Sequence, residues 1–425
     1  MLLTQCSFCA VDLGLTLGKK CGRCSTRYCG PECQVQHWKE GGHDKLCKLI
    51  KKAGGAEQYN ANKKYAEAVA VAVEKCADDT KGQTCYICRE SSHRRTKEGL
   101  VRGCACHTTE GFVHVSCLAE QAKLLVTEAE ENYNLYGTES GGSSWAQWRM
   151  CSLCKQNYHG VVACALGWAC WKTYVGRPER DQVRCMALQV LGNGLLLADH
   201  LEDACSVAEI DLSTLRRIGA PEDYILVSQN NLAGTYQSLR RFEDASRMLR
   251  DVYSIWLKRH GAEHGDALLA ALNYAASLVN LHRYKEAKSL MRRMIPVARR
   301  VLGESNELTL KMSGCYAEAL KKDPGATLDD LHEAVRTLED LQRTARRVLG
   351  SAHPVAVNID LTLRESQEVL SLARKTGDVR ITQAVQHLYN LRTPFREDDT
   401  QLVVSVHRDD KPLPVETEDG DADTR

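Results

Sequence analysis

The sequence predicts a mainly α-helical chain in which two small zinc-stapled modules precede an α-helical solenoid. Three observations support this fold class. Cysteines and histidines at metal-ligand spacing are concentrated in the first 154 residues. The later part of the chain repeats itself with a period of 42 residues. Within each repeat, apolar residues recur at the spacing of an amphipathic helix.

The cysteines and histidines form two sets of eight, each sufficient for two tetrahedral zinc sites. The first set comprises Cys6, Cys9, Cys21, Cys24, Cys29, Cys33, His43 and Cys47. The second comprises Cys85, Cys88, Cys104, Cys106, His114, Cys117, Cys151 and Cys154. Because the N-terminus lacks the apolar stretch of a secretory signal, we expect reduced thiols that bind metal. The sequence therefore predicts four Zn²⁺ ions, two in each module.

The first set follows the order CSFC, CGRC, RYCGPEC and HDKLC, and residues 6–47 resemble a MYND zinc finger. The resemblance implies two interleaved sites, Cys6, Cys9, Cys29 and Cys33 on one zinc and Cys21, Cys24, His43 and Cys47 on the other. His43 rather than His37 is the implied ligand because it stands four residues before the last cysteine. MYND fingers typically bind short proline-containing peptides, so a protein or peptide partner is implied.

The charge balance gives no reason to expect nucleic acid or a membrane as a partner. The formal net charge is +1, so there is no bulk electrostatic attraction to polyanions. Residues 1–52 are basic, but the aromatic residues that would stack bases are sparse there. No apolar run approaches the roughly 20 residues that span a bilayer. We therefore expect a cytoplasmic or nuclear protein.

The second set has the order C4HC3, which RING-CH fingers of ubiquitin ligases share with PHD fingers of histone readers. A single residue separates Cys104 from Cys106, and seven precede His114. PHD fingers have a wider third clip, a shorter run to histidine, and a tryptophan closer to the seventh ligand than Trp148 is to Cys151. Residues 85–154 thus resemble a RING-CH finger. The resemblance implies one zinc on Cys85, Cys88, His114 and Cys117 and another on Cys104, Cys106, Cys151 and Cys154.

A RING-type ligase has no nucleophile of its own and positions a charged E2 enzyme for attack by a substrate lysine. The resemblance implies E2-binding roles for Ile87, inside the first clip, and for Lys155, beside the last clip. Gln121 stands where RING-CH ligases usually carry a tryptophan. Trp145 and Trp148, from the long insert before the last clip, are the candidates to replace it.

Two alternatives to a RING-type ubiquitin transferase stay open. Gln121 favours a non-catalytic adaptor whose RING-like fold does not engage an E2. A PHD-like histone reader would need an aromatic cage for methyl-lysine, for which only Tyr86 and Phe112 are candidates. No phosphate-binding loop, dinucleotide glycine motif, HExxH or GxSxG occurs in the sequence, so we predict no catalytic residues.

The segments NNLAGTYQSLRRFEDA (230–245) and NYAASLVNLHRYKEA (273–287) align at an offset of 42. Each predicts two antiparallel helices that meet near Arg-Arg-Phe or His-Arg-Tyr, with alanines where the helices cross. They resemble the tetratricopeptide repeats of kinesin light chains, which implies a stacked solenoid with a peptide groove. Asn231 and Asn273 recur at this period and are predicted to bind a peptide backbone. Helix-surface solvation is the alternative interpretation of these asparagines.

The sequence thus describes a zinc-binding protein-interaction protein. We interpret it as a RING-CH ligase whose repeats or MYND finger select the substrate, or as an adaptor. The expected segments are a MYND-type finger (1–50), a helical linker (51–80), a RING-CH-type finger (81–157) with a long loop (127–148), a helical adaptor (158–190), tetratricopeptide-like repeats (191–392) and an acidic disordered tail (393–425).

Overall fold

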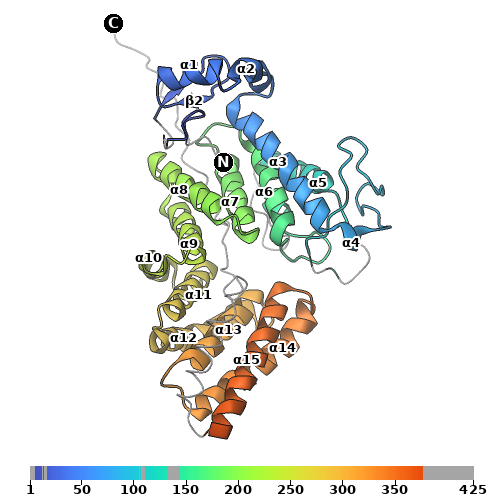
Figure 1. Cartoon of the computed structure of the whole chain (residues 1–425). Helices are drawn as coiled ribbons and strands as arrows, with labels where there is room; N and C mark the ends of the chain where they lie inside the picture. The colour runs from blue at the N-terminus through green and yellow to red at the C-terminus, as the bar shows by residue number, and fades with distance from the viewer. Residues whose placement is uncertain are drawn as a thin grey trace. The chain divides into compact units, whose positions relative to one another are not determined.

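The computed structural model describes residues 5–11, 13, 17–104, 106, 111–132 and 144–376. As predicted, this part of the chain is mainly helical, with a cysteine-rich N-terminal region and a solenoid of helix pairs (Figure 1). The chain separates into two compact units. The described residues of the first unit lie mainly within 5–103 and 111–228, and those of the second mainly within 229–376. None of the described helices is both long and apolar enough to cross a membrane.

The first finger combines a minimal sheet with two short helices. Strand β1 (Lys19–Lys20) pairs antiparallel with β2 (Arg27–Tyr28), and α1 (Pro31–Lys39) and α2 (His43–Lys52) follow. Apart from cysteines, the buried apolar residues of this cluster are Leu13, Tyr28, Ile50 and Ala56. So small a core buries too little surface to hold the segment by itself.

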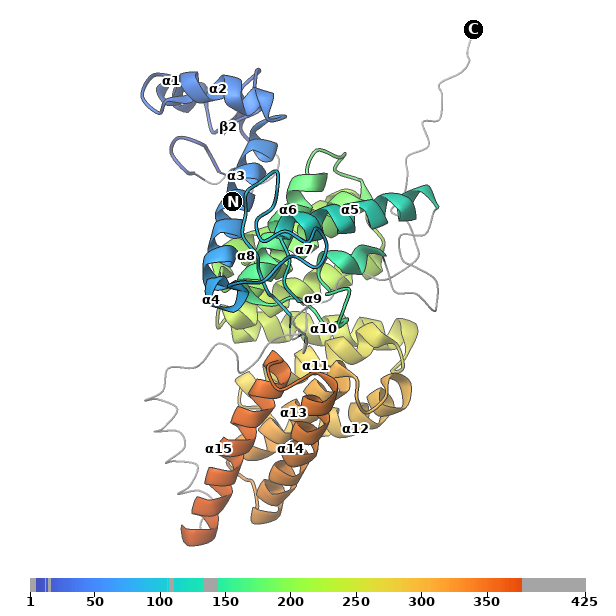
Figure 2. The same cartoon turned by 90° about the vertical axis from the view of Figure 1, so that its right-hand side faces the viewer.

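The first finger continues into a long helix that supports the second finger. Helix α3 (Ala56–Lys75) begins where the amide of Ala56 donates to the carbonyl of Cys24, at 2.9 Å. Along its length α3 packs against α6 (Gly160–Tyr174), and a short helix, α4 (Ala77–Thr80), follows it (Figure 2). The linker expected over 51–80 is thus helical over most of its length.

The second finger contains α5 (Val115–Glu131) and a 3₁₀ turn, η1 (Ser144–Trp148). The loop expected over 127–148 is shorter than predicted, because α5 continues to Glu131 and η1 forms its end. The acidic composition of this stretch suggested a loop, but Val126 and Ala129 lie on the buried face of α5 and extend the helix. The middle of the expected loop, 133–143, lies outside the described residues.

Helices α6 and α7 (Gln182–Leu197) approach each other unusually closely. A Cβ atom on Gly194 would lie 2.6 Å from the carbonyl oxygen of Ala163, and one on Gly167 would lie 3.1 Å from the Cα of Leu191. These contacts are backbone to backbone, so no side chain fits between the helices at these two glycines. Helix α8 (Leu201–Arg217) packs on the other side of α7. The boundary expected at residue 190 falls within α7, since the helical pattern continues across it.

The solenoid is built from helix pairs whose order follows the predicted repeats. These helices are α9 (Glu222–Ser238), α10 (Phe242–His260), α11 (Gly265–Asn280), α12 (Tyr284–Leu302), α13 (Glu307–Lys322), α14 (Leu328–Val348) and α15 (Pro354–Thr376). The predicted turns are confirmed at Arg240 and His282, whose φ angles are +58° and +59°. Asp199, between α7 and α8, has φ +64°, so this pair uses the same turn.

The connections between successive helix pairs share a second feature, a left-handed glycine followed by a side-chain helix cap. Gly261, Gly303 and Gly350 have φ between +82° and +92°. Three residues after each glycine, a side chain accepts a hydrogen bond from the backbone N–H two residues further on and so caps the next helix. The capping residues are His264, Asn306 and His353. The repeat therefore specifies both ends of each connection.

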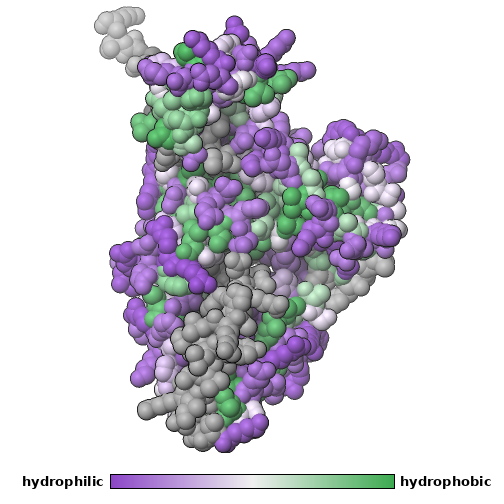
Figure 3. Space-filling model, viewed as in Figure 1, coloured by the Kyte–Doolittle hydropathy of each residue, from purple (hydrophilic) through white to green (hydrophobic). Residues whose placement is uncertain are grey.

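Alanines lie where the paired helices cross, as the sequence predicts. Ala245, Ala287 and Ala317 are fully buried, and larger residues such as Leu249 and Tyr284 pack around the crossings. The described surface of these helices is mainly hydrophilic on the face that Figure 3 shows. The end of the expected repeat region, 377–392, and the expected tail, 393–425, lie outside the described residues.

Candidate metal centres

Four Cys-x-x-Cys clips fold into the same tight turn. In each, the backbone N–H of the first cysteine donates to the carbonyl five residues on, at 2.8–3.0 Å. The residue four positions after that cysteine returns a hydrogen bond to its carbonyl, at 2.8–2.9 Å. These returning residues, all with φ between +57° and +64°, are Ala10, Ser25, Arg89 and Lys155. The turn leaves the two thiols on one side, which is the arrangement that a shared metal requires.

Backbone N–H groups stabilise the thiolate form of the leading cysteines. Burial by itself would raise the pKa of Cys6, but the amides of Cys9, Cys29 and Phe8 outweigh it and lower the pKa to about 6. The pKa values of Cys21 and Cys85 are lowered in the same way, against the effect of burial. The thiolate is the form that coordinates metal, so these backbone contacts favour metal binding at the three leading cysteines.

In the first finger the structure brings together the two predicted ligand groups. One consists of Cys6, Cys9, Cys29 and Cys33, and the other of Cys21, Cys24, His43 and Cys47. Within each group all four ligand atoms lie within 4.8 Å of one another. The groups differ in exposure: the second is buried throughout, whereas Cys9 and Cys29 of the first are exposed. We call the buried group, Cys21, Cys24, His43 and Cys47, the inner cluster, and the group with exposed cysteines the outer cluster.

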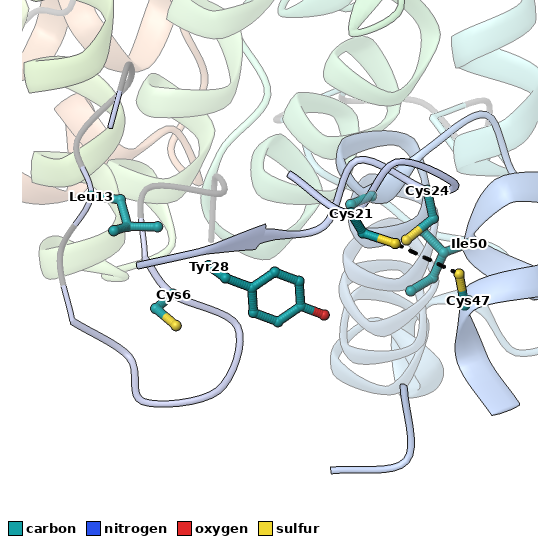
Figure 4. Close-up of a cluster of buried hydrophobic side chains, with 8 residues drawn as sticks. Cys6, Leu13, Cys21, Cys24, Tyr28, Cys47 and Ile50 are labelled. Carbon is teal, nitrogen blue, oxygen red and sulfur yellow. Dashed lines mark hydrogen bonds between the residues drawn. The ribbon is translucent and has the colours of Figure 1, made fainter. Parts of the chain in front are cut away.

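Tyr28 separates the inner from the outer cluster. Figure 4 shows its ring between Cys6 on one side and Cys21, Cys24 and Cys47 on the other. The ring is fully buried, and its hydroxyl lies 3.0 Å from Nδ1 of His37. Burial, together with the charges of the surrounding thiolates, raises the pKa of Tyr28. His37 is thus engaged by Tyr28, whereas Nε2 of His43 lies 3.5 Å from Sγ of Cys24, among the thiols of its cluster.

In the second finger the structure also assembles the two predicted groups. Cys85, Cys88, His114 and Cys117 form one, and Cys104, Cys106, Cys151 and Cys154 form the other. Each pairs residues from distant parts of the sequence and has its ligand atoms within 4.8 Å. The isolated bridge between Val101 and Val113 holds the two halves of the segment side by side. The order of the ligands is therefore that of a cross-brace.

The spacing of the ligand atoms fits tetrahedral zinc. Sγ–Sγ distances between partners run from 3.3 to 3.9 Å. A tetrahedral site with Zn–S bonds of about 2.3 Å has sulfur atoms about 3.8 Å apart, whereas a disulfide joins sulfurs at about 2.05 Å. The four donor sets, all thiol or thiol with imidazole, are those of closed structural zinc sites.

The two histidines of these clusters present different ring nitrogens to the neighbouring thiols. Nε2 of His43 lies 3.5 Å from Sγ of Cys24, whereas Nδ1 of His114 lies 3.3 Å from Sγ of Cys88 and 3.6 Å from that of Cys117. Both rings are fully buried. Burial lowers the pKa of each imidazole, which favours the neutral form that binds metal.

The residues predicted to bind an E2 lie on the surface of the second finger. The side chain of Ile87 is 37% exposed, and Lys155 is exposed beside the last clip. The sequence did not single out Leu153, which is 43% exposed at the equivalent position of the last clip. The hydroxyls of Tyr86 and Ser152 lie 3.1 Å apart and join the two clips. Ile87 and Leu153 therefore project from adjoining turns.

The two tryptophans that were candidates to replace the missing aromatic are buried. Trp145 and Trp148 are 2% and 1% exposed, and both pack against the ring of Tyr174 on α6. Neither candidate supplies a surface aromatic, because packing against α6 buries both rings. Gln121 lies partly exposed on α5.

The aromatic cage expected of a histone reader does not form between its two candidates. Phe112 is 4% exposed, with the guanidinium of Arg102 centred 5.2 Å from its ring. The hydroxyl of Tyr86 contacts Ser152 instead of framing a pocket with Phe112. These contacts give both rings a structural role within the finger.

The asparagines predicted to contact a peptide are buried. Asn231 is 8% exposed and Asn273 is 1% exposed. The Nδ2 of Asn273 donates to Oδ1 of Asn230 at 3.0 Å, and the carbonyl of Asn273 accepts from Gln237. In this arrangement Asn273 joins helices α9 and α11. A role for these asparagines in peptide binding stays a prediction.

Two segments of the chain match known protein families. Residues 6–47 match the MYND finger, and residues 224–300 match a tetratricopeptide repeat. Among curated proteins, none matches the chain. Each matched segment coincides with one of the structures described above: the first with the inner and outer clusters, the second with helices α9 to α12.

Solved structures similar to this chain include the nearly identical TPR-like repeats of a Podosopora anserina protein described as a kinesin light chain. Two crystal structures of these repeats, one with a single substitution, are each 17% identical to this chain and cover 55% of it and 97% of their own length. Their TM-scores are 0.35 and 0.34. The two family matches by themselves show that the chain combines a MYND-type zinc finger with tetratricopeptide repeats, an architecture of protein interaction.

Proposed function

We propose that this chain is a zinc-dependent ubiquitin ligase whose second finger recruits an E2 and whose first finger and repeats select the substrate. The observation that carries the proposal is the pair of exposed apolar residues on adjoining metal clips, Ile87 and Leu153. Singly exposed apolar residues are common on protein surfaces. Two that project from neighbouring turns, fixed by ligands on both sides, form a rigid contact suited to a protein partner.

The proposed mechanism is positional. The ligands of the second finger would hold two Zn²⁺ ions in closed sites, so the metal supplies folding energy and no open position for substrate. Ile87 and Leu153 would bind the E2, and the exposed ammonium of Lys155 would contact the charged E2 complex beside them. The finger then acts by holding the E2 thioester where a substrate lysine reaches it.

The first finger offers a surface for substrate selection. On α1, Val35 and Trp38 stand one helical turn apart and are 49% and 41% exposed. Aromatic residues of this kind are common anchors at protein interfaces. We expect Trp38→Ala to weaken capture of a proline-containing peptide while leaving the zinc content unchanged, as measured by fluorescence anisotropy and native mass spectrometry.

The ligase proposal is tested by autoubiquitination of zinc-loaded, full-length protein with a panel of E2 enzymes. We expect ubiquitin chains with at least one E2 and their loss in Ile87→Ala and in Leu153→Ala. Phe8→Ala is the matched control, because Phe8 occupies the same position in a first-finger clip and is also 37% exposed. Native mass spectrometry should count the same number of zinc ions in all variants.

A non-catalytic adaptor is the second candidate function. It is favoured by Gln121 in the place of the usual tryptophan and by the burial of both insert tryptophans. An adaptor predicts no ubiquitin chains with any E2 from protein that holds its full zinc complement. It also predicts that Gln121→Trp does not create activity, whereas a ligase limited by that residue should gain it.

A further inference from the structure

Residues 93–98 form a fifth turn of the same kind as the four metal clips, although they contain no cysteine. The N–H of His93 donates to the carbonyl of Glu98 at 3.0 Å, and the N–H of Lys97 returns to the carbonyl of His93 at 2.9 Å. Lys97 has φ +60°, like the corresponding residue of each clip. His93 and Thr96 occupy the two ligand positions, and their Nδ1 and Oγ1 atoms lie 2.7 Å apart. A side-chain hydrogen bond thus takes the place of the shared metal.

This metal-free turn is held firmly against the second finger. The two carboxylate oxygens of Glu98 accept from the backbone N–H and the hydroxyl of Ser116, at 2.6 and 2.8 Å. The ring of His93 packs edge-on against His114, with centroids 5.4 Å apart. The base of the turn is therefore fixed on α5 and on a predicted metal ligand.

The tip of the turn differs in chemistry from those of the four clips. The clips carry Ser-Phe, Gly-Arg, Tyr-Ile and Ser-Leu between their cysteines, whereas this turn carries Arg94 and Arg95. Both arginines are exposed, as are the neighbouring cations Arg89 and Lys97. We call these four residues, Arg89, Arg94, Arg95 and Lys97, the arginine knuckle.

The arginine knuckle carries an excess of positive charge. Glu90 is its only described ion-pair partner, 2.5 Å from Arg94, whose side chain is 84% exposed. Glu98, the other acidic residue of the loop, is engaged by Ser116. The field also reaches α6: burial lowers the pKa of Lys172, and although Glu98 opposes the shift, Arg95 adds to it.

We propose that the arginine knuckle is a docking site for an acidic peptide segment of a partner protein. Guanidinium groups bind carboxylate and phosphoryl oxygens through paired, charge-assisted hydrogen bonds. Because the backbone beneath them is already fixed, little conformational freedom of the turn is lost on binding. Aspartate or glutamate side chains and phosphorylated serines present the same acceptor chemistry, and both are sources of such a segment. Arg89 belongs to the same clip turn as Ile87, whereas Arg94 and Arg95 lie on the metal-free turn. The proposal does not depend on ligase activity.

The test measures binding of three fluorescent peptides to zinc-loaded, full-length protein by anisotropy. One peptide carries a run of Asp and Glu, one carries phosphoserines at the same positions, and one carries serines. We expect the variant Arg94→Ala/Arg95→Ala to bind at least one acidic peptide about tenfold or more weakly than the unmodified protein. The charge-matched control is Arg293→Ala/Arg299→Ala, which removes two exposed arginines from α12.

The outcomes separate the source of the charge and the specificity of the site. Selective loss with the Asp/Glu peptide supports carboxylate recognition, and selective loss with the phosphopeptide alone supports phosphoryl recognition. Equal weakening by both double variants would show only general charge attraction and would overturn the proposal. So would an absence of binding of either acidic peptide to the unmodified protein. Native mass spectrometry confirms that each variant retains its zinc.

Discussion

The fingers and the helix pairs reverse the chain with the same backbone element but hold it in place differently. Every non-glycine residue of the described chain with a positive φ belongs to one of these two kinds of turn. In the finger region they are Ala10, Ser25, Arg89, Lys97 and Lys155, and in the helix pairs they are Asp199, Arg240 and His282. A left-handed residue other than glycine costs about 1–2 kcal/mol, so each needs support from its surroundings.

The source of that support separates the two regions. In the helix pairs, buried alanines at the crossings and leucines such as Leu249 pack between the two helices and stabilise the turn that joins them. In the fingers, the turns carry polar or exposed residues, and the ligand clusters provide the long-range connections. The comparison teaches that metal bound at these clusters would stabilise the fingers as the apolar core stabilises the solenoid.

Removal of metal should have the largest effect and should separate the two regions most clearly. A structural zinc contributes roughly 10–16 kcal/mol in small modules, so chelation should unfold both fingers and leave α10 to α15 folded. Hydrogen exchange should show lost protection over 19–50 and 85–132, with 265–348 unchanged. Zinc added back should restore protection. Protected fingers in protein shown to be metal-free would contradict the assignment of the clusters as structural.

A second prediction concerns the effect of a buried charge on the stability of the helix pairs, at Asp211 on α8. Burial raises its pKa from the ordinary 3.8 to about 7, although the nearby hydroxyl of Ser228 and a hydrogen bond from Gln189 oppose the shift. Since the folded state binds this proton more tightly, ionisation destabilises it progressively as pH rises from about 4 to 7, by roughly 4 kcal/mol at most. Asp211→Asn should therefore raise the free energy of unfolding at pH 8 and have little effect at pH 4.

Chemical denaturation of Asp211→Asn at the two pH values provides the measurement. Asp340→Asn is the control, because Asp340 is 71% exposed and lies on α14. A gain of equal size at both pH values would mean that hydrogen bonding, rather than the buried charge, sets the effect.

Close packing between α6 and α7 predicts a smaller loss. Gly194→Ala would place a methyl group 2.6 Å from the carbonyl oxygen of Ala163, so the helices must separate. Overpacking of this kind typically costs about 1–3 kcal/mol. Thermal unfolding should show a lower midpoint for Gly194→Ala, whereas Gly314→Ala on α13, where a Cβ meets no atom within 4 Å, should not lower it.

The smallest expected effect concerns a helix cap, whose contribution to stability should depend on pH. Nδ1 of His353 accepts from the N–H of Val355, and burial lowers the pKa of this ring, with Glu307 opposing and Lys311 assisting. The contribution of the neutral ring is complete above its ordinary pKa near 6.5 and is lost as pH falls through the lower, folded value. His353→Asn copies the cap that Asn306 already provides and should remove this dependence.

Caps of this type contribute about 1 kcal/mol. Between pH 7 and 5 the unfolding midpoint should therefore fall further in the unmodified protein than in His353→Asn. Parallel decreases in the two proteins would show that other groups account for the acid sensitivity.

Much of this organisation follows from the sequence because its signals are local. Ligand type and spacing indicated the candidate ligands, and the resemblances to MYND and RING-CH fingers implied which four would meet in each cluster. The 42-residue offset predicted the turns at Arg240 and His282. Periodicity did not show that Asn273 would be buried, because recurrence does not specify which face of a helix is covered.

Other features depend on contacts that a motif does not encode. The metal clips are recognised in the sequence by their cysteine pairs, and residues 93–98 contain no cysteine. The turn at 93–98 was therefore not predicted, because backbone hydrogen bonds alone reveal its shape. Leu153 was not singled out because its importance arises from the contact between Tyr86 and Ser152, which lie 66 positions apart. The surface contacts of the second finger therefore could not be predicted from the sequence, whereas its candidate ligands could.

The unequal exposure of the two clusters in the first finger has a consequence for metal exchange. The thiols of Cys9 and Cys29 are open to solvent, whereas all four ligands of the inner cluster are covered. A chelator, an oxidant or a competing soft metal therefore reaches one ion of the pair before the other. The finger should therefore lose and regain its metals in a fixed order, through a form that holds metal only in the inner cluster.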